Sequence, residues 1–233
     1  MDMQNKNQRE RIFPIIGAIL SVYAVVLVFQ AIRSIVSTIR VIFNPTISDF
    51  LPHYHFLIIE AVIGVAAGLA AAGAYFCLAV YLGLLYRQDR GHALLPTFFG
   101  LLSFNQLLVI VNIVNSVISV LALRAQEFSG FTTTAVLTFA CHAVLLVLCV
   151  LSLLSSLRGL ENKLPVYLLC GAFCVTSIAM AVLTFRTPTR TTLISTTLTT
   201  AAEIVRWLLI AYAIRYMEIP PFTRARPDAQ AEG

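Results

Sequence analysis

A chain of 233 residues in which 59% are hydrophobic and only 12% are charged has lipid rather than water around most of its fold. Its net charge of +5 does not indicate nucleic-acid binding, because the basic residues are scattered at the ends of apolar runs without a dense cluster. An open β-sheet is excluded because lipid cannot satisfy its edge amides, and continuous apolar runs do not fit the alternating pattern of a β-barrel.

Six apolar runs are each long enough to cross a bilayer as a helix. They cover 13–35, 56–86, 95–123, 134–157, 165–185 and 192–216. The sequence therefore predicts an all-α fold, a polytopic transmembrane helix bundle that occupies 13–217. An N-terminal arm, 1–12, precedes the bundle, and the proline-containing tail, 218–233, is expected to be disordered.

The first run is too long for the apolar core of a signal peptide, and no small-residue cleavage site follows it. We therefore expect it to remain as an anchor. The longest external connection, 36–55, mixes apolar residues with Asn44-Pro45 and Leu51-Pro52. We expect the helix to extend into this segment before a turn-rich loop, and a short amphipathic helix in the membrane interface is the alternative.

One face of the second run carries small residues. Gly64 and Gly68, four positions apart, allow another helix to approach closely. We expect this face to pack against another helix of the same chain, and the alternative is that it joins two copies of the protein. Glu60 lies about one turn inside the same run, where its side chain can reach the membrane interface, and a proton-linked role is the alternative.

Amide side chains mark the third run. Asn105 and Asn112 share one stripe with Ser116 and Ser119, and Asn115 lies beside it. Buried amides in lipid need partners, and hydrogen bonds to a neighbouring helix, worth about 1 kcal/mol or less each, provide them. A solute path along the stripe is the alternative, which makes the three asparagines candidate site residues.

The cysteines and the one histidine of the fourth run do not form a recognised metal motif. All five cysteines lie inside apolar runs, which argues against a disulfide framework. His142, Cys170 and Cys174 are potential ligands, but they lack a known ligand spacing. We therefore expect neither a metal nor another cofactor.

The sixth run contains the strongest candidate site. Glu203 and Arg206 lie near its middle and, three positions apart, share a helix face on which they can pair. A charge at this depth costs about 2.5–3.5 kcal/mol on insertion scales, so both side chains should face protein or water. They form either a site for an ion, a proton or a polar solute, or a structural ion pair. Trp207, the next residue, is expected to pack.

Threonine and serine are frequent at the start of the sixth run. Seven of the ten residues from 191 to 200 carry a hydroxyl. We expect these hydroxyls to bond to the preceding helical turn or to a neighbouring helix. A hydrated vestibule is the alternative.

A pattern recurs at an offset of 69 residues. It joins Leu82, Leu84, Leu85, Leu95 and Pro96 to Leu151, Leu153, Leu154, Leu164 and Pro165. A shorter match begins at Pro14. Proline suits the first turn of a helix, where its missing amide is no loss. Three repeated hairpins of consecutive runs would explain the pattern, and so would the chance similarity of leucine-rich helices.

The distribution of basic residues favours cytoplasmic termini. Six spans place both termini on one side, where ten basic residues lie, against five on the opposite side and Arg206 inside a span. Lysine and arginine are enriched in cytoplasmic loops.

A family resemblance rests on the ends of two spans. The segment from Tyr86-Arg87 to Leu95-Pro96 has an aromatic span end, a basic loop and a proline-opened span, and Tyr212, Arg215 and Phe222 mark the end of the last span. These features resemble a bacterial family of small multi-pass membrane proteins of unknown function. The resemblance implies an inner-membrane location and no known activity. The chain departs from that family in having additional spans and Glu-Ile-Pro at 218–220 in place of a basic cluster.

No complete catalytic, metal or nucleotide motif occurs in the sequence. The leading hypothesis is an accessory or structural membrane protein that associates with the lipid bilayer and with another membrane protein or a second copy of itself. The rival is a permease for ions or small polar solutes, and a membrane enzyme ranks last. A continuous polar cavity joining Glu203, Arg206 and Asn112 would favour transport, whereas dry packing around a closed ion pair would favour a structural role.

Overall fold

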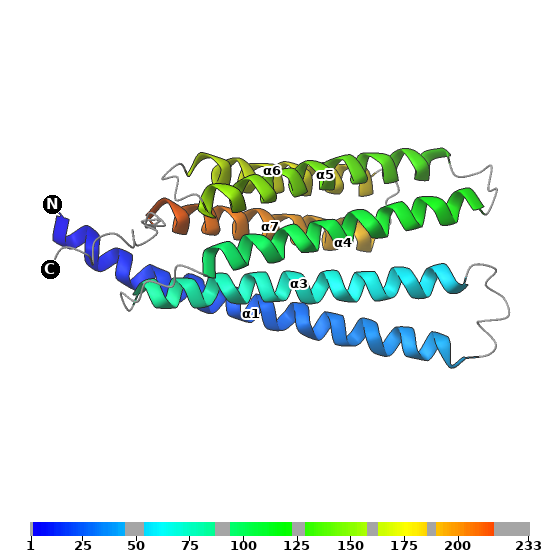
Figure 1. Ribbon diagram of the computed structural model, residues 1–233, viewed down its shortest axis with the longest axis horizontal. Helices are drawn as coiled ribbons and strands as arrows, with labels where there is room; N and C mark the ends of the chain where they lie inside the picture. Colours follow the sequence, from blue (N-terminus) through cyan, green and yellow to red (C-terminus); the bar gives the residue numbers. More distant parts are fainter. Residues whose placement is uncertain are drawn as a thin grey trace, which may run out of the picture.

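The computed structural model describes residues 2–44, 54–86, 94–122, 129–157, 163–185 and 190–216. Within these ranges all residues except 43, 44, 163 and 185, which flank helices, are helical, and none lies in a strand. The helices are α1 (Asp2–Ile42), α3 (Tyr54–Tyr86), α4 (Leu94–Ala122), α5 (Ser129–Leu157), α6 (Leu164–Thr184) and α7 (Arg190–Tyr216). Each contains a stretch long and apolar enough to cross a membrane. The protein is a polytopic transmembrane helix bundle (Figure 1), which confirms the predicted fold class and its six spans.

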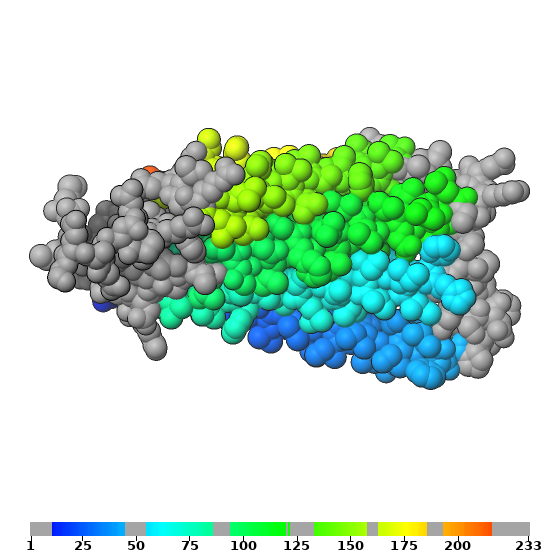
Figure 2. All heavy atoms as spheres, in the orientation of Figure 1, coloured from blue at the N-terminus to red at the C-terminus, as the bar shows by residue number. Residues whose placement is uncertain are grey.

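The helices follow one another around the bundle. Each packs against the next one along the chain, and α7 also contacts α1, which closes the sequence of neighbours. Figure 2 shows α1, α3, α4 and α5 as adjoining bands in chain order on one face. The start of α1 and the end of α7 lie at the same end of the bundle (Figure 1). We call this the terminal end and the opposite end the far end.

The outward surface of the bundle is apolar. Phe29, Val175 and Ile194, on three different helices, each leave about two thirds of their surface uncovered, at 67%, 66% and 66%. A water-soluble monomer rarely exposes a continuous apolar surface of this kind. Lipid chains are the solvent that suits it, because they cost nothing to place against leucine, valine and phenylalanine.

The main cluster of buried apolar side chains lies in the half of the bundle nearer the terminal end. It consists of Ile16, Leu20, Ala24, Ala74, Tyr75, Leu78, Ala79, Tyr81, Leu82, Leu95, Phe98, Phe99, Leu102, Cys149, Val166, Leu169, Cys170, Trp207, Ile210, Ala213 and Ile214. In the helices that leave the terminal end these residues lie early in the membrane span, and in the helices that return to it they lie late. Apolar packing therefore closes the bundle at this end.

The structure corrects one prediction about proline. Pro14 does not open the first helix, because α1 begins at Asp2 and Pro14 lies inside it. The turns before it make their own backbone hydrogen bonds, so only the bond that the missing amide would have donated is lost. Pro96 and Pro165 do lie in the first turns of α4 and α6. The predicted N-terminal arm is thus helical from Asp2 onward.

Two predicted segments fall wholly or partly outside the described residues. The helix overhang expected after position 35 is present, because α1 continues to Ile42. The rest of the external connection, 45–53, lies outside the described residues, and so does the predicted tail at 218–233.

Candidate functional site

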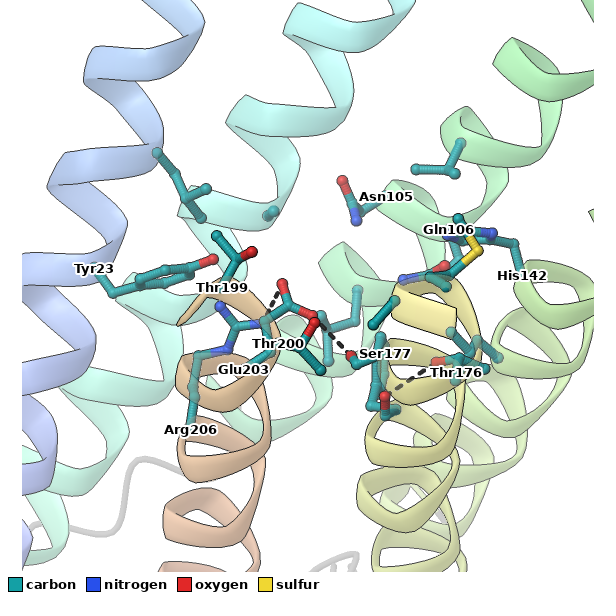
Figure 3. A pocket seen from close by; sticks show the side chains of 18 of the residues that line it. Tyr23, Asn105, Gln106, His142, Thr176, Ser177, Thr199, Thr200, Glu203 and Arg206 are labelled. Carbon is teal, nitrogen blue, oxygen red and sulfur yellow. Dashed lines mark hydrogen bonds and ion pairs between the residues drawn. The ribbon is translucent and has the colours of Figure 1, made fainter. Parts of the chain in front are cut away.

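A cavity of about 400 Å³ lies between the helices, and all six contribute residues to its lining. Its polar wall includes Asn105, Gln106, His142, Ser177, Glu203 and Arg206 (Figure 3). On each helix these residues begin where the buried core ends, so the core forms the floor of the cavity. Thr184 and Thr196, near the far end of α6 and α7, also line it. The cavity therefore extends from mid-membrane toward the far end.

Glu203 and Arg206 lie at the inner part of this cavity and form an ion pair. Nη2 of Arg206 is 3.3 Å from Oε1 of Glu203, while Ser177 on α6 donates a hydrogen bond of 2.8 Å to Oε2. The Arg206 side chain is 12% exposed, whereas that of Glu203 is 42% exposed. The carboxylate therefore faces the cavity, and the guanidinium is held in its wall.

Aromatic rings from two other helices surround Arg206. Its guanidinium carbon Cζ lies 4.3 Å from the ring centre of Tyr23 on α1, 4.9 Å from that of Tyr75 on α3 and 5.7 Å from that of Trp207. Ring faces attract a cation at these distances. The indole of Trp207 is buried and stacks on Phe173, with ring centres 3.9 Å apart. Sequence reasoning missed Tyr23 and Tyr75, because tyrosine in an apolar run carries no local signal of a partner on α7.

The wall opposite Glu203 carries amide and imidazole groups. Gln106 is only 4% exposed, and its Oε1 has no hydrogen-bond partner among the described residues. Nδ1 of His142 lies 2.8 Å from the carbonyl oxygen of Thr138. Figure 3 shows both side chains, with Asn105, across the cavity from Glu203. Gln106 was also missed, although an amide inside an apolar run is a signal that the sequence contains.

The asparagine stripe of α4 divides between the cavity and its surroundings. Asn105 lines the cavity, but Asn112 and Asn115 are not part of its lining, so the cavity joins Glu203 and Arg206 to Asn105 and not to Asn112. Each of these two has one buried side-chain atom, Oδ1 and Nδ2 respectively, without a hydrogen-bond partner in the described part of the chain. Nearby, Ser116 donates a hydrogen bond of 3.1 Å to Glu60 on α3. One residue of the stripe, Asn105, therefore lines the cavity, and another, Ser116, takes part in the contact between α3 and α4.

The two glycines of α3 have different surroundings. A Cβ added at Gly68 would lie 3.8 Å from the Cβ of Ala31 on α1, so this position faces the α1–α3 contact. A Cβ added at Gly64 would meet nothing within 4 Å. Only Gly68 therefore takes part in packing within the described chain.

The hydroxyls at the start of α7 have both of the roles considered for them. Thr197 and Thr199 donate to the carbonyl oxygens of Leu193 and Ser195, at 2.8 Å and 2.7 Å. Thr196, Thr199 and Thr200 line the cavity. Backbone bonding and a polar vestibule are therefore compatible, because a hydroxyl oxygen that donates its hydrogen can still accept.

The potential metal ligands are separated. His142 lines the cavity, whereas Cys170 is buried in the core and Cys174 packs against it. Across the ranges that the structure describes, no group of three histidine, cysteine or acidic side chains is placed to hold a metal ion.

No protein-family model, curated protein or solved structure matches this chain. The resemblance to small multi-pass membrane proteins stays a prediction. The cavity and its charged pair are therefore the features that indicate a function.

The chemistry of the cavity suits reversible binding of a polar molecule. A buried polar group without a partner costs free energy in apolar surroundings, and Gln106 presents one at the cavity wall. An ion pair with one exposed carboxylate adds a charged contact at mid-membrane depth. A polar solute could satisfy both groups, and the low dielectric of the surrounding helices would strengthen each contact.

Proposed function

We propose that this membrane protein binds a small polar solute between its helices and passes it across the membrane. The observation that carries the proposal is a cavity to which all six helices contribute, with polar groups on part of its wall and the Glu203–Arg206 pair at mid-membrane depth. Ionisable residues inside membranes are costly and are typical of solute and ion pathways. A volume of about 400 Å³ lies within the range of small-molecule sites.

The one-sided closure of the bundle supports transport by alternating access. The apolar core separates the cavity from the terminal end, while the cavity reaches toward the far end. A carrier in this state would admit solute from the far side and release it after the core opened. We further propose a bacterial inner membrane and cytoplasmic termini, since basic residues are twice as frequent on the terminal side. The cavity would then face away from the cytoplasm.

The alternative is an accessory or structural role, which the surface of α3 favours. Gly64 is exposed with open space around it, so a helix of another protein or of a second copy could approach there. This role does not require a polar cavity. Binding of a partner without movement of solute would support it.

Thiol labelling tests the direction in which the cavity opens. In a cysteine-free background, a single cysteine at Thr200, in the cavity lining, should react with a membrane-impermeant thiosulfonate added from the far side. A cysteine at Ala213, in the buried core, should not react from either side. Labelling of Thr200→Cys from the terminal side, or equal labelling of both positions, would contradict the proposed conformation.

Flux in liposomes tests the function itself. Purified protein would be reconstituted and assayed with labelled amines, amino acids, sugars and inorganic ions, with empty liposomes as the baseline. We expect flux of at least one solute, reduced by Glu203→Gln and retained in Glu60→Gln, which removes an acidic group outside the cavity lining. Absence of flux for every solute class would reject the permease.

A further inference from the structure

Four hydroxyl groups that line the cavity donate their hydrogens to neighbouring oxygens. Thr176, Thr184 and Thr199 donate to the carbonyl oxygens of Phe173, Met180 and Ser195, at 3.0 Å, 2.9 Å and 2.7 Å. Ser177 donates to Glu203 at 2.8 Å. A hydroxyl has one hydrogen and two lone pairs. Toward a solute, these four oxygens therefore act as acceptors.

The opposite wall presents acceptors as well. A carbonyl oxygen can only accept, so the contact between Nδ1 of His142 and Thr138 places the ring hydrogen on Nδ1. In the neutral ring, Nε2 is then a bare acceptor. Oε1 of the buried Gln106 is a second acceptor, and it has no donor among the described residues.

The charges that line the cavity favour a cation. Glu203 exposes 42% of its side chain, whereas the guanidinium of Arg206 is 12% exposed and covered by three aromatic rings. The ring faces are themselves negative. An approaching solute therefore meets the carboxylate before it meets the guanidinium, and an anion would be repelled by both the carboxylate and the rings.

We infer that the solute is a small organic cation with N–H donors, such as a primary amine in its ammonium form. Its positive charge would face Glu203, and its hydrogens would be shared among the hydroxyl oxygens, Gln106 and His142. An ammonium group has three donors and no acceptor, which complements the hydroxyl oxygens, Gln106 Oε1 and His142 Nε2. This inference rests on the proposed function, because it names the solute that the same cavity would carry.

Calorimetric titration of the purified protein in detergent tests this class of solute with four probes that share a size range. Butylammonium offers charge and donors, tetramethylammonium offers charge without donors, butanol offers neither charge nor several donors, and butyrate reverses the charge. We expect butylammonium to bind about tenfold or more tightly than each of the others, because a hydrogen bond to a charged group contributes that much. Equal or tighter binding of butyrate or butanol, or no binding of butylammonium, would overturn the inference.

Variants localise the binding. Glu203→Gln should weaken butylammonium binding about tenfold or more. If the unpaired Arg206 prevents this variant from folding, the double variant Glu203→Gln/Arg206→Gln, which removes both charges, takes its place. Glu60→Gln, outside the cavity lining, should bind as the parent does. Unchanged binding in a folded double variant would overturn the site.

The flux assay separates this inference from the proposed function. Binding of butylammonium without flux of any solute would reject the permease and keep the amine site. Flux of a sugar or an anion without amine binding would keep the permease and reject the amine.

Discussion

The energetic role of the Glu203–Arg206 pair can be measured by removing the two charges separately and together. Glu203→Gln keeps the shape of the side chain and an oxygen that can accept from Ser177, but it leaves the 12%-exposed Arg206 without a counter-ion. Breaking a fully buried pair costs about 3–5 kcal/mol, and breaking an exposed pair costs less than about 1 kcal/mol. Glu203 is 42% exposed and the three rings still stabilise Arg206, so we expect a loss of about 2 kcal/mol in the free energy of unfolding.

Arg206→Gln removes the ring contacts but leaves a carboxylate that water in the cavity and Ser177 can solvate. The double variant contains neither charge, so it avoids the unpaired charge that each single variant leaves behind. We therefore expect the double variant to be more stable than the sum of the single losses predicts, with a coupling energy of about 1–3 kcal/mol.

Trp207 provides the signal for this measurement, because it is the only tryptophan in the chain and lies next to the pair. Unfolding of each variant in mixed micelles of mild detergent and dodecyl sulfate would be followed by its fluorescence. Glu60→Gln combined with Arg206→Gln is the control, and its effects should add within about 0.5 kcal/mol. A coupling energy for Glu203 and Arg206 below about 0.5 kcal/mol would refute the reasoning, since the pair would then behave as an exposed one.

Three further changes test the packing around the site, all by the same unfolding assay. Gly17→Ala places a Cβ 3.3 Å from the carbonyl oxygen of Ala79 and should lower the free energy of unfolding by about 1–3 kcal/mol. Gly64→Ala meets open space, so it should leave the free energy of unfolding unchanged or raise it by up to about 1 kcal/mol. Equal changes in the two variants would contradict the described α1–α3 contact. Ser177→Ala removes a hydrogen bond to the carboxylate and should cost about 1 kcal/mol, and a neutral result would show that water replaces it fully. Phe173→Leu removes the ring stacked on Trp207, so the tryptophan emission of the folded protein should shift, and an unchanged spectrum would argue against the stack.

The helices and the charged pair could be predicted because both depend on local sequence. A continuous apolar run in lipid must satisfy its own backbone, which only a helix does within one segment. The pairing of Glu203 with Arg206 needs only a separation of three residues on a helix.

The inward faces of the helices could not be predicted, because lipid and the protein interior are both apolar. Leu78 is fully buried while Phe76, two residues earlier, is 57% exposed. Nothing in the run around them distinguishes the two environments. The contacts of Tyr23 and Tyr75 with Arg206 depend on how α1 and α3 are rotated about their axes, and the place of Gln106 in the cavity wall depends on the rotation of α4. The sequence does not determine these rotations. Pro14 was misplaced for a different reason, since a helix can begin well before its apolar part.

The length of α1 has a mechanical consequence. Its 41 residues span about 61 Å at 1.5 Å per residue, which exceeds the thickness of about 40–45 Å for a bilayer with its headgroups. The sequence of α1 is polar up to Arg11 and apolar from Ile12 onward, so its first turns extend the helix beyond the apolar span at the terminal end as a stalk. Pro14 lies near the base of this stalk and omits one backbone hydrogen bond there. Because prolines are common sites of helix bending, the stalk can bend relative to the rest of α1 more readily there than an unbroken helix could.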